Sequence, residues 1–171
     1  NEICMRHAEG IRSNTPVLAK LWYFWTNHFT ISDTQSLASF STGAYQREFI
    51  RANMDKKFET MAIEATIAWP MMMHLDNKDN VGPKSKSAKS EWRRREKRPA
   101  TINENHAREL LELHTVSHNA GYTQEDIIEL AKIMTGWRPK WSKQKDQGSD
   151  VSFDTDRHEP GKKTIFGKVY K

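Results

Sequence analysis

Apolar residues recur at helical spacing along much of this 171-residue chain. The first clear stripe occupies positions i, i+3, i+4, i+7 and i+11, which is one face of an α-helix. It comprises Leu18, Leu21, Trp22, Trp25 and Phe29. Thr15 is a suitable N-cap and Pro16 suits the first helical position. The pattern therefore predicts a helix over residues 16–28.

Residues 32–75 show further short helical patterns. After a Ser/Thr-rich connector (32–42), residues 43–53 form a predicted helix with Tyr45, Phe49 and Ala52 facing inward. Asp55 is the predicted cap of another helix, whose inner face comprises Phe58, Met61, Ala62 and Ala65. The pair Trp69-Pro70 breaks or kinks that helix, because the residue before proline disfavours helical backbone. Residues 71–75 are expected to form a short apolar turn.

Two stronger patterns follow, over 103–114 and 124–135. In the first, Ala107, Leu110, Leu111 and His114 share one face. Glu104, Arg108 and Glu112 share the opposite face at spacing of four, where ion pairs form in water. The second helix opens with Thr123 and Asp126, which resemble a capping box, and closes at Gly136. Its inner stripe comprises Ile127, Leu130, Ala131 and Met134.

The remaining segments lack helical periodicity. Residues 76–101 are rich in Lys, Arg and Ser and are predicted to form a long basic loop, and 138–171 to form a loop-rich tail. Weak alternation at 164–170 suggests a short hairpin in that tail. The expected fold class is mainly α: a multi-helix packed domain with a basic loop. We expect residues 1–171 to be a single domain, a fragment of a longer chain.

Composition narrows the class of protein further. Six Trp, seven Phe, four Tyr and seven Met indicate an aromatic, adaptable core. Mean hydropathy is −0.83, and no apolar run approaches the ~20 residues of a membrane helix. The single cysteine, Cys4, excludes a disulfide within these 171 residues. Three tryptophans, at 22, 25 and 137, are expected to be at least partly buried, whereas Trp92 is expected to be exposed.

The positive charge is concentrated in the basic loop. The chain carries a net charge of +5, and residues 78–98 hold nine Lys/Arg against three acids. Within 84–98 the candidate polyanion-binding residues are Lys89, Trp92, Arg93, Arg94, Arg95 and Arg98. They could clamp phosphates of nucleic acid, or an acidic polysaccharide, and stack a base. We favour an exposed connector, because no nucleic-acid-binding fold accompanies the cluster.

Two histidines lie on or beside the apolar faces of predicted helices. His28 flanks the first stripe and His114 lies within the later one, with Glu109 at its border. The favoured interpretation is that each histidine braces the core by hydrogen bonding. In the alternative, His28, His114 and Glu109 are catalytic groups or ligands of a divalent metal such as Zn or Fe, with His158 as a further candidate ligand. The chain has no HExxH motif, and whether it is an enzyme stays open.

Four segments together resemble a large bacterial family known only as domain of unknown function 1800. They are WYFWTNHFTIS (22–32), LDNKDNVGP (75–83), INENHARELLELHTVSHNAGYTQEDIIELAKIMTGW (102–137) and FDTDRHEPGKKTIFGK (153–168). The stretch from His158 to Lys163 is similar to the family's HD-x-G-x-K segment, with Glu159 in place of Asp. The resemblance implies a protein without an established activity. It also implies longer chains on both sides, export to the periplasm or exterior, and another exported protein as partner.

Three hypotheses of function follow, in order of preference. The first is a structural or interaction module of an exported bacterial protein. The second is a metal-assisted hydrolase that uses His28, His114 and nearby carboxylates. The third is a polyanion or nucleic-acid binder that acts through the basic loop 84–98.

Overall fold

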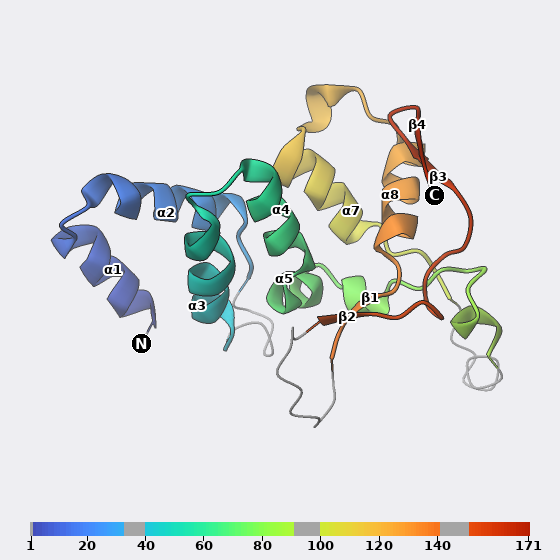
Figure 1. The fold of residues 1–171 in the computed structure, drawn as a ribbon, viewed down its shortest axis with the longest axis horizontal. Coiled ribbons are helices and arrows are strands. Elements are labelled where there is room, and N and C mark those ends of the chain that lie inside the picture. Colours follow the sequence, from blue (N-terminus) through green and yellow to red (C-terminus); the bar gives the residue numbers. More distant parts are fainter. Residues whose placement is uncertain (1, 33–39, 91–99, 141–150) are drawn as a thin grey trace. The chain divides into compact units, whose positions relative to one another are not determined.

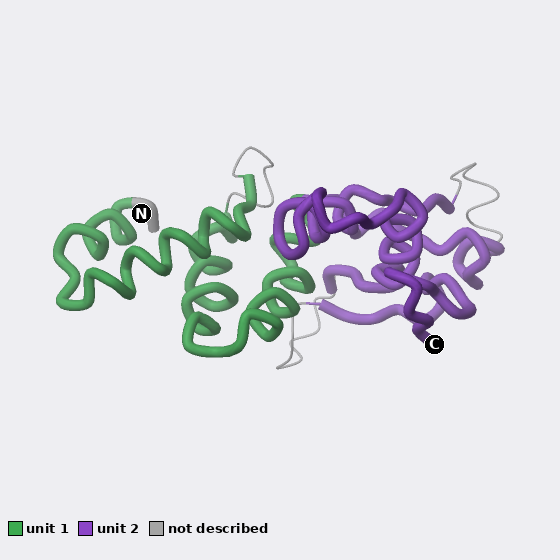
Figure 2. Tube along the Cα trace, turned by 90° about the horizontal axis from the view of Figure 1, so that it is seen from above, with its two compact units in different colours: residues 1–74 green, residues 75–171 purple. Residues whose placement is uncertain are grey.

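The computed structural model describes residues 2–32, 40–90, 100–140 and 151–171. They divide into two compact units, residues 1–74 and 75–171, coloured separately in Figure 2. The described part is dominated by helices, with two small antiparallel strand pairs, so the predicted mainly α class is confirmed (Figure 1). None of the helices in these ranges combines the length and apolarity needed to cross a membrane.

In the described part of the first unit, all the regular elements are helices. It contains α1 (Glu2–Arg12), α2 (Pro16–His28), α3 (Thr42–Tyr45), η1 (Gln46–Ile50), η2 (Arg51–Asn53), α4 (Phe58–Ile67) and α5 (Trp69–His74). The predicted helix over 16–28 is confirmed at both ends, with proline at its first position. Helices α3, η1 and η2 run on from one another, as predicted for 43–53, although η1 is a wider π-helical turn.

The inner face of α2 differs from the predicted stripe. Its buried residues are Ala19, Trp22 and Thr26, followed by Phe29, whereas Leu18 and Leu21 are exposed. The orientation of Trp22 accounts for this face, because its indole Nε1 donates to the Gln46 carbonyl at 3.0 Å. A hydrogen bond of the indole N–H to a neighbouring helix sets which side of α2 faces inward.

Four local expectations in this unit were wrong. Phe58, the first residue of α4, is exposed rather than on its inner face. Ala52 is exposed and Asn53 is buried instead, because the π-helical turn η1 inserts an extra residue and rotates the following face. Helix α4 begins after Lys57, so Asp55 does not cap it. Residues 69–74 form helix α5 rather than an apolar turn, since the break falls at Ala68 and Pro70 lies in the first helical turn, where proline is tolerated.

The second unit combines helices with two strand pairs. Its helical elements are η3 (Asn77–Asp79), η4 (Ser87–Lys89), α7 (Asn105–Glu109), η5 (Leu110–Thr115), η6 (His118–Ala120) and α8 (Gln124–Met134). Strands β1 (Trp137–Pro139) and β2 (Val151–Phe153) pair antiparallel with Arg138 opposite Ser152. Strands β3 (Lys163–Ile165) and β4 (Lys168–Tyr170) pair with Thr164 opposite Val169, which confirms the predicted hairpin.

The core of this unit lies between α7–η5 and α8, on the predicted faces. Its buried members are Ala107, Leu111, Ile127, Ala131 and Met134. On the opposite side of the first helix, Arg108 forms ion pairs with Glu104 at 3.1 Å and Glu112 at 3.4 Å, as the spacing predicted. The α-helical part begins two residues later than expected, and the Asn103 side chain accepts the Asn105 amide just before it.

The C-terminal hairpin is fastened to α8 by two carboxylates. Asp126 accepts the Phe166 amide at 2.7 Å, and Glu129 accepts the Thr164 amide at 2.9 Å. The hairpin turn places Phe166 and Gly167 at positive φ, 49° and 73°, as a type I′ turn requires. Asp126 also completes the predicted capping box with Thr123. One side chain thus joins the start of α8 to the tail.

Candidate functional site

Three segments far apart in the sequence meet at the C-terminal end of α8. They are residues 77–85, 131–137 and 154–163, and their polar side chains form an arrangement that we call the clamp. Its members are Asn77, Asn80, Thr135, His158, Glu159 and Lys163. Most are buried, His158 being half-buried. The segments include three of the stretches that resemble a known family in sequence.

Two buried asparagines cap α8 from one side. Asn77 donates its side-chain amide to the carbonyls of Met134 and Trp137, each at 3.2 Å. Asn80 donates to the Ala131 carbonyl at 2.8 Å and to Asn77 Oδ1 at 3.1 Å. The last carbonyls of a helix have few partners within it, and these amides add donors to them; the Ala131 carbonyl also accepts the Thr135 amide at 3.1 Å.

Thr135 connects the end of α8 to the tail. Its hydroxyl donates to the Lys132 carbonyl at 2.6 Å and accepts the Glu159 amide at 2.8 Å. Gly136 follows at φ 92°, and a Cβ there would lie 2.8 Å from the Asp154 carbonyl oxygen. Both the backbone angle and the close approach therefore require glycine at this stop.

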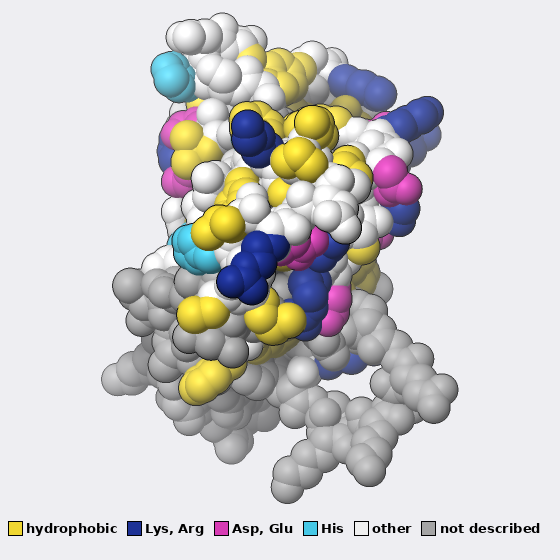
Figure 3. Space-filling model, turned by 90° about the vertical axis from the view of Figure 1, so that its left-hand side faces the viewer, with side chains coloured by type: hydrophobic (Ala, Val, Ile, Leu, Met, Phe, Trp, Pro, Cys, Tyr) yellow, Lys and Arg dark blue, Asp and Glu magenta, His cyan; other side chains and the backbone are white. Residues whose placement is uncertain are grey.

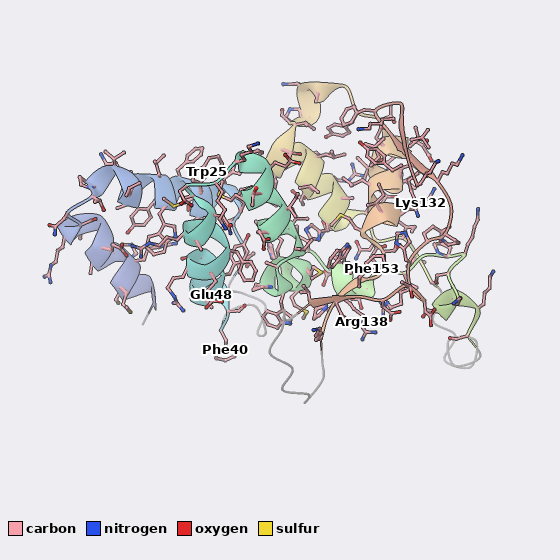
Figure 4. The ribbon with its side chains drawn as sticks, in the orientation of Figure 1. Trp25, Phe40, Glu48, Lys132, Arg138 and Phe153 are labelled. Atoms are coloured by element: carbon pink, nitrogen blue, oxygen red, sulfur yellow. The ribbon has the colours of Figure 1, made fainter. Side chains whose placement is uncertain are left out.

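His158 is held through both ring nitrogens. Nδ1 lies 2.8 Å from the Thr135 carbonyl, and Nε2 lies 2.9 Å from Lys163 Nζ. A carbonyl can only accept, so Nδ1 carries the proton. Nε2 is then a lone pair that accepts from the lysine. This pattern specifies a neutral imidazole. The Phe153 ring packs 5.2 Å from the imidazole (Phe153 is labelled in Figure 4).

Lys163 is a buried cation at this position. Only 5 % of the residue is exposed, and its ammonium donates to His158 Nε2 and to the Glu159 carbonyl. Burial lowers the pKa of Lys163, while the nearby carboxylates of Glu159 and Glu129 act in the opposite direction. Its position near the C-terminal end of α8 is favourable, because that end of a helix carries partial negative charge.

Glu159 and Gly82 fit closely together beside the clamp. The carboxylate Oε2 of Glu159 accepts the Lys84 amide at 2.9 Å. A Cβ on Gly82 would lie 2.5 Å from the Glu159 Cα, a distance at which backbone atoms must move. Glycine is therefore needed here for space rather than for an unusual backbone angle. The buried charge of Glu159 gains a hydrogen bond from the backbone of the 82–85 turn.

The clamp is built for bracing, because its polar groups satisfy one another. His158 has no ring nitrogen left to act as a base or ligand while it keeps these bonds. In the part of the chain that the structure describes, no group of three His, Cys, Asp or Glu side chains could hold a metal ion. The arrangement fixes one tautomer of His158 and buries the Lys163 ammonium. These interactions fasten the tail to α8.

The residues predicted as a metal or catalytic site have other surroundings. His28, in the first unit, is half-buried among the rings of Phe24, Trp25, Phe29 and Phe58. His114 is buried and Glu109 half-buried in the second unit. A joint site of His28, Glu109 and His114 therefore stays a prediction. The fully buried His106 is a further core histidine of the second unit.

Only the start of the predicted polyanion site falls within the described residues. Lys89 is exposed in η4, whereas Trp92, Arg93, Arg94, Arg95 and Arg98 lie outside them. Next to η4 is an open groove of about 520 Å³, and its three basic side chains are already engaged. Lys86 pairs with Asp156 at 3.2 Å, Arg138 with Asp154 at 3.4 Å, and Arg157 donates to the Lys78 carbonyl. The groove thus holds three basic side chains against two carboxylates, and each basic side chain already has a hydrogen-bond or ion-pair partner.

The sequence did not predict the buried asparagines of the clamp, because no apolar periodicity surrounds them. Asn77 and Asn80 lie within a charged stretch that predicts a solvated loop. The available signal was their spacing of three together with Gly82, which suggests a turn whose side chains face backbone. Their acceptors lie more than fifty residues further along, so no local pattern could reveal the partner.

The fold and the clamp define a mainly helical protein whose second unit is organised around the end of one capped helix. The chain belongs to the family described as "Protein of unknown function (DUF1800)", whose model matches residues 2–171. The resemblance expected from the four segments is thereby confirmed. No curated protein and no solved structure matches the chain.

Proposed function

We propose that this chain is a protein-interaction module that binds a partner through an exposed apolar face of α2. The observation that carries the proposal is a stripe at i, i+4 and i+7, formed by Val17, Leu21 and Phe24. These residues are 70 %, 43 % and 56 % exposed. Side chains of this size and spacing are those that helix-to-helix contacts use.

Helix α2 is apolar on most of its circumference. Ala19, Trp22 and Thr26 face inward, the stripe faces outward, and Leu18 lies between these two faces. Its other polar side chains are Lys20, Asn27 and the half-buried His28. A helix that is hydrophobic on nearly all sides is normally buried, so the exposed stripe favours a contact with another molecule.

Aromatic rings extend the stripe toward α4. The Phe24 ring lies 4.9 Å from Trp25, and the Trp25 ring lies 5.6 Å from the exposed Phe58. Figure 3 shows hydrophobic side chains interspersed with Lys and Arg on the face that it draws, and Figure 4 labels Trp25 on α2. Large aromatic residues with an apolar surround are the usual anchors of protein interfaces.

A small pocket adjoins the same helix. It has a volume of about 230 Å³, and Leu18, Leu21, Trp22 and Met54 form its apolar lining. Arg51 covers one side, with its guanidinium 4.9 Å from the Trp22 ring and paired with Glu9. A pocket of this size suits one large apolar side chain of a partner. Burying such a side chain contributes roughly 1.5–3 kcal/mol.

A photo-crosslinking amino acid at position 21 tests the proposal, with the same group at Asn27, on the polar side of α2, as the matched control. We expect a discrete adduct with another protein from position 21 and none from position 27. The captured protein is then purified and its affinity measured directly. Leu21→Glu should weaken binding at least about tenfold, the loss expected of an interface anchor, while Lys20→Glu should not.

Three outcomes would contradict the proposal. The adduct could form within the chain itself, which would make the stripe an internal contact. Both positions could capture the same proteins equally. Leu21→Glu could lower the melting temperature as much as Trp22→Ala, which would show that Leu21 stabilises the fold rather than a complex.

A further inference from the structure

The two hydrogen bonds of His158 make different demands on its protonation. The bond to the Thr135 carbonyl, at 2.8 Å, requires a proton on Nδ1. The bond from Lys163 Nζ, at 2.9 Å, requires a lone pair on Nε2. Only the neutral imidazole satisfies both. A second proton, on Nε2, would place an N–H against an ammonium and bring two positive charges within hydrogen-bond distance.

We propose that His158 is a proton-sensitive latch, whose protonation in mild acid expels the Lys163 ammonium and loosens the attachment of the tail to the end of α8. Histidine is the side chain whose charge changes in this pH range. Lys163 begins strand β3, so displacement of its side chain acts directly on the first strand of the hairpin. The latch concerns folding of the tail and is independent of the partner surface on α2.

The charged groups around the pair do not remove this conflict. From α8, Glu129 and Lys132 face Lys163 and are already hydrogen-bonded to each other. From the tail itself, the Glu159 carboxylate is bonded to the Lys84 amide, and Asp154 is paired with Arg138 of β1. Each nearby carboxylate thus has a partner of its own. Among the described contacts of His158, none is to a carboxylate that would stabilise the imidazolium.

The opening should be local, because other bonds hold the rest of the hairpin. Asp126 and Glu129 keep the Phe166 and Thr164 amides, and both carboxylates stay ionised in mild acid, since their pKa values are lowered. The Glu159 amide also keeps its bond to Thr135 Oγ1. Mild acid should therefore expose residues 158–163 while α8 and the core stay folded.

Amide hydrogen exchange of the whole chain, at about pH 7.5 and about pH 5.5, measures the opening, because the change spans the pH range in which histidine titrates. After correction for intrinsic rates, we expect protection at residues 158–163 in wild type to be lower at the acid pH than at the neutral pH. His158→Gln keeps a donor and an acceptor but cannot titrate, so the fall should disappear. Lys163→Met removes the opposing cation, so the fall should shrink.

The matched control is His118→Gln, in the exposed η6 of the same unit, which should behave as wild type. The proposal is overturned if His158→Gln keeps the wild-type pH dependence, or if wild type shows none. Nitrogen chemical shifts of the His158 ring in wild type give a measurement that needs no variant. At about pH 7.5 they should report a proton on Nδ1 alone, and a proton on Nε2 there would refute the latch.

Discussion

Asp126 and Phe166 lie forty residues apart, and one carboxylate oxygen of Asp126 accepts the Phe166 amide at 2.7 Å. The other oxygen accepts the amide and hydroxyl of Thr123 at 2.8 Å each. The first turn of α8 and the turn of the hairpin are therefore fastened through the same side chain. Loss of either bond should therefore destabilise both the first turn of α8 and the hairpin turn.

Removing the cap of α8 should destabilise the second unit. Thr123→Ala deletes the hydroxyl that accepts the Asp126 amide and leaves one N-terminal amide of the helix without that partner. We expect the free energy of unfolding to fall by ~1 kcal/mol. Urea denaturation measures it. Thr123→Ser keeps the hydroxyl and should lie close to wild type. Equal losses in both variants would contradict the capping role.

Acid should weaken the attachment of the hairpin below the range of the histidine latch. Backbone hydrogen bonds from Thr123 and Phe166 lower the pKa of Asp126. Burial of Glu129 acts to raise its pKa, but hydrogen bonds from Lys132 and Thr164 lower it overall. Both pKa values are lower in the folded state than in the unfolded chain. The resulting stability is complete above the ordinary carboxyl pKa and is lost as pH falls through the folded values.

Substitution of both carboxylates checks that acid dependence. Asp126→Asn combined with Glu129→Gln removes the two titrating groups, so the decline in stability below about pH 4.5 should become shallower than in wild type. Denaturation midpoints across that range provide the measurement. Glu125→Gln is the control, since it changes an exposed acid of the same helix turn. An unchanged acid decline in the double variant would contradict the attachment described.

Alanine substitutions at Gly82 and Gly121 should destabilise the fold for different reasons, close packing at Gly82 and backbone strain at Gly121. Gly82→Ala places a methyl group 2.5 Å from the Glu159 Cα and should cost about 3 kcal/mol, at the upper end of overpacking. Gly121→Ala has φ 77° and nothing within 4 Å of the added methyl group, so strain alone should cost about 1–2 kcal/mol. Thermal melts compare the two. A smaller loss at Gly82 than at Gly121 would contradict the contact.

Removing a buried asparagine of the clamp should take a donor from the end of α8 and an acceptor from the Asn103 amide. Asn80→Ala deletes the donor to the Ala131 carbonyl and the acceptor of the Asn103 amide. Because the site is buried, we expect a loss of about 2–3 kcal/mol in unfolding free energy. Asn119→Ala, on the exposed η6, is the control and should change little. Urea denaturation distinguishes the clamp from a solvated loop, for which both losses would be small.

Local patterns in the sequence predicted what depends on neighbouring residues. The inner stripe of α8, its capping box and the hairpin predicted at 164–170 all follow from residues that are close together in the sequence. The ion pairs of Arg108 with Glu104 and Glu112 belong to the same class. These features need no distant partner, so their residues carry the whole signal.

The features that could not be predicted depend on distant partners or on helix irregularity. The inward side of α2 is set by the bond from Trp22 to the Gln46 carbonyl, twenty-four residues away. The π-helical turn η1 rotates the face that follows, which displaced Ala52 in favour of Asn53. The sequence predicts Asn77 and Asn80 to be loop residues, because it does not show that α8 lies beside them. For Trp22 and the two asparagines, the missing information is the position of another segment.

The clamp also has a consequence for synthesis of the chain. The last carbonyls of α8 are bonded by side chains at 77 and 80, which are made before it, and Thr135 is bonded by the amide of Glu159, which is made after it. While the ribosome has reached only α8, the helix has its asparagine partners but not the tail. The attachments of the tail to α8 can form only when residues 159–166 have emerged. The final folding step of the second unit should therefore follow synthesis of this segment, so nascent chains that end before residue 159 should expose the end of α8 to chaperones and proteases.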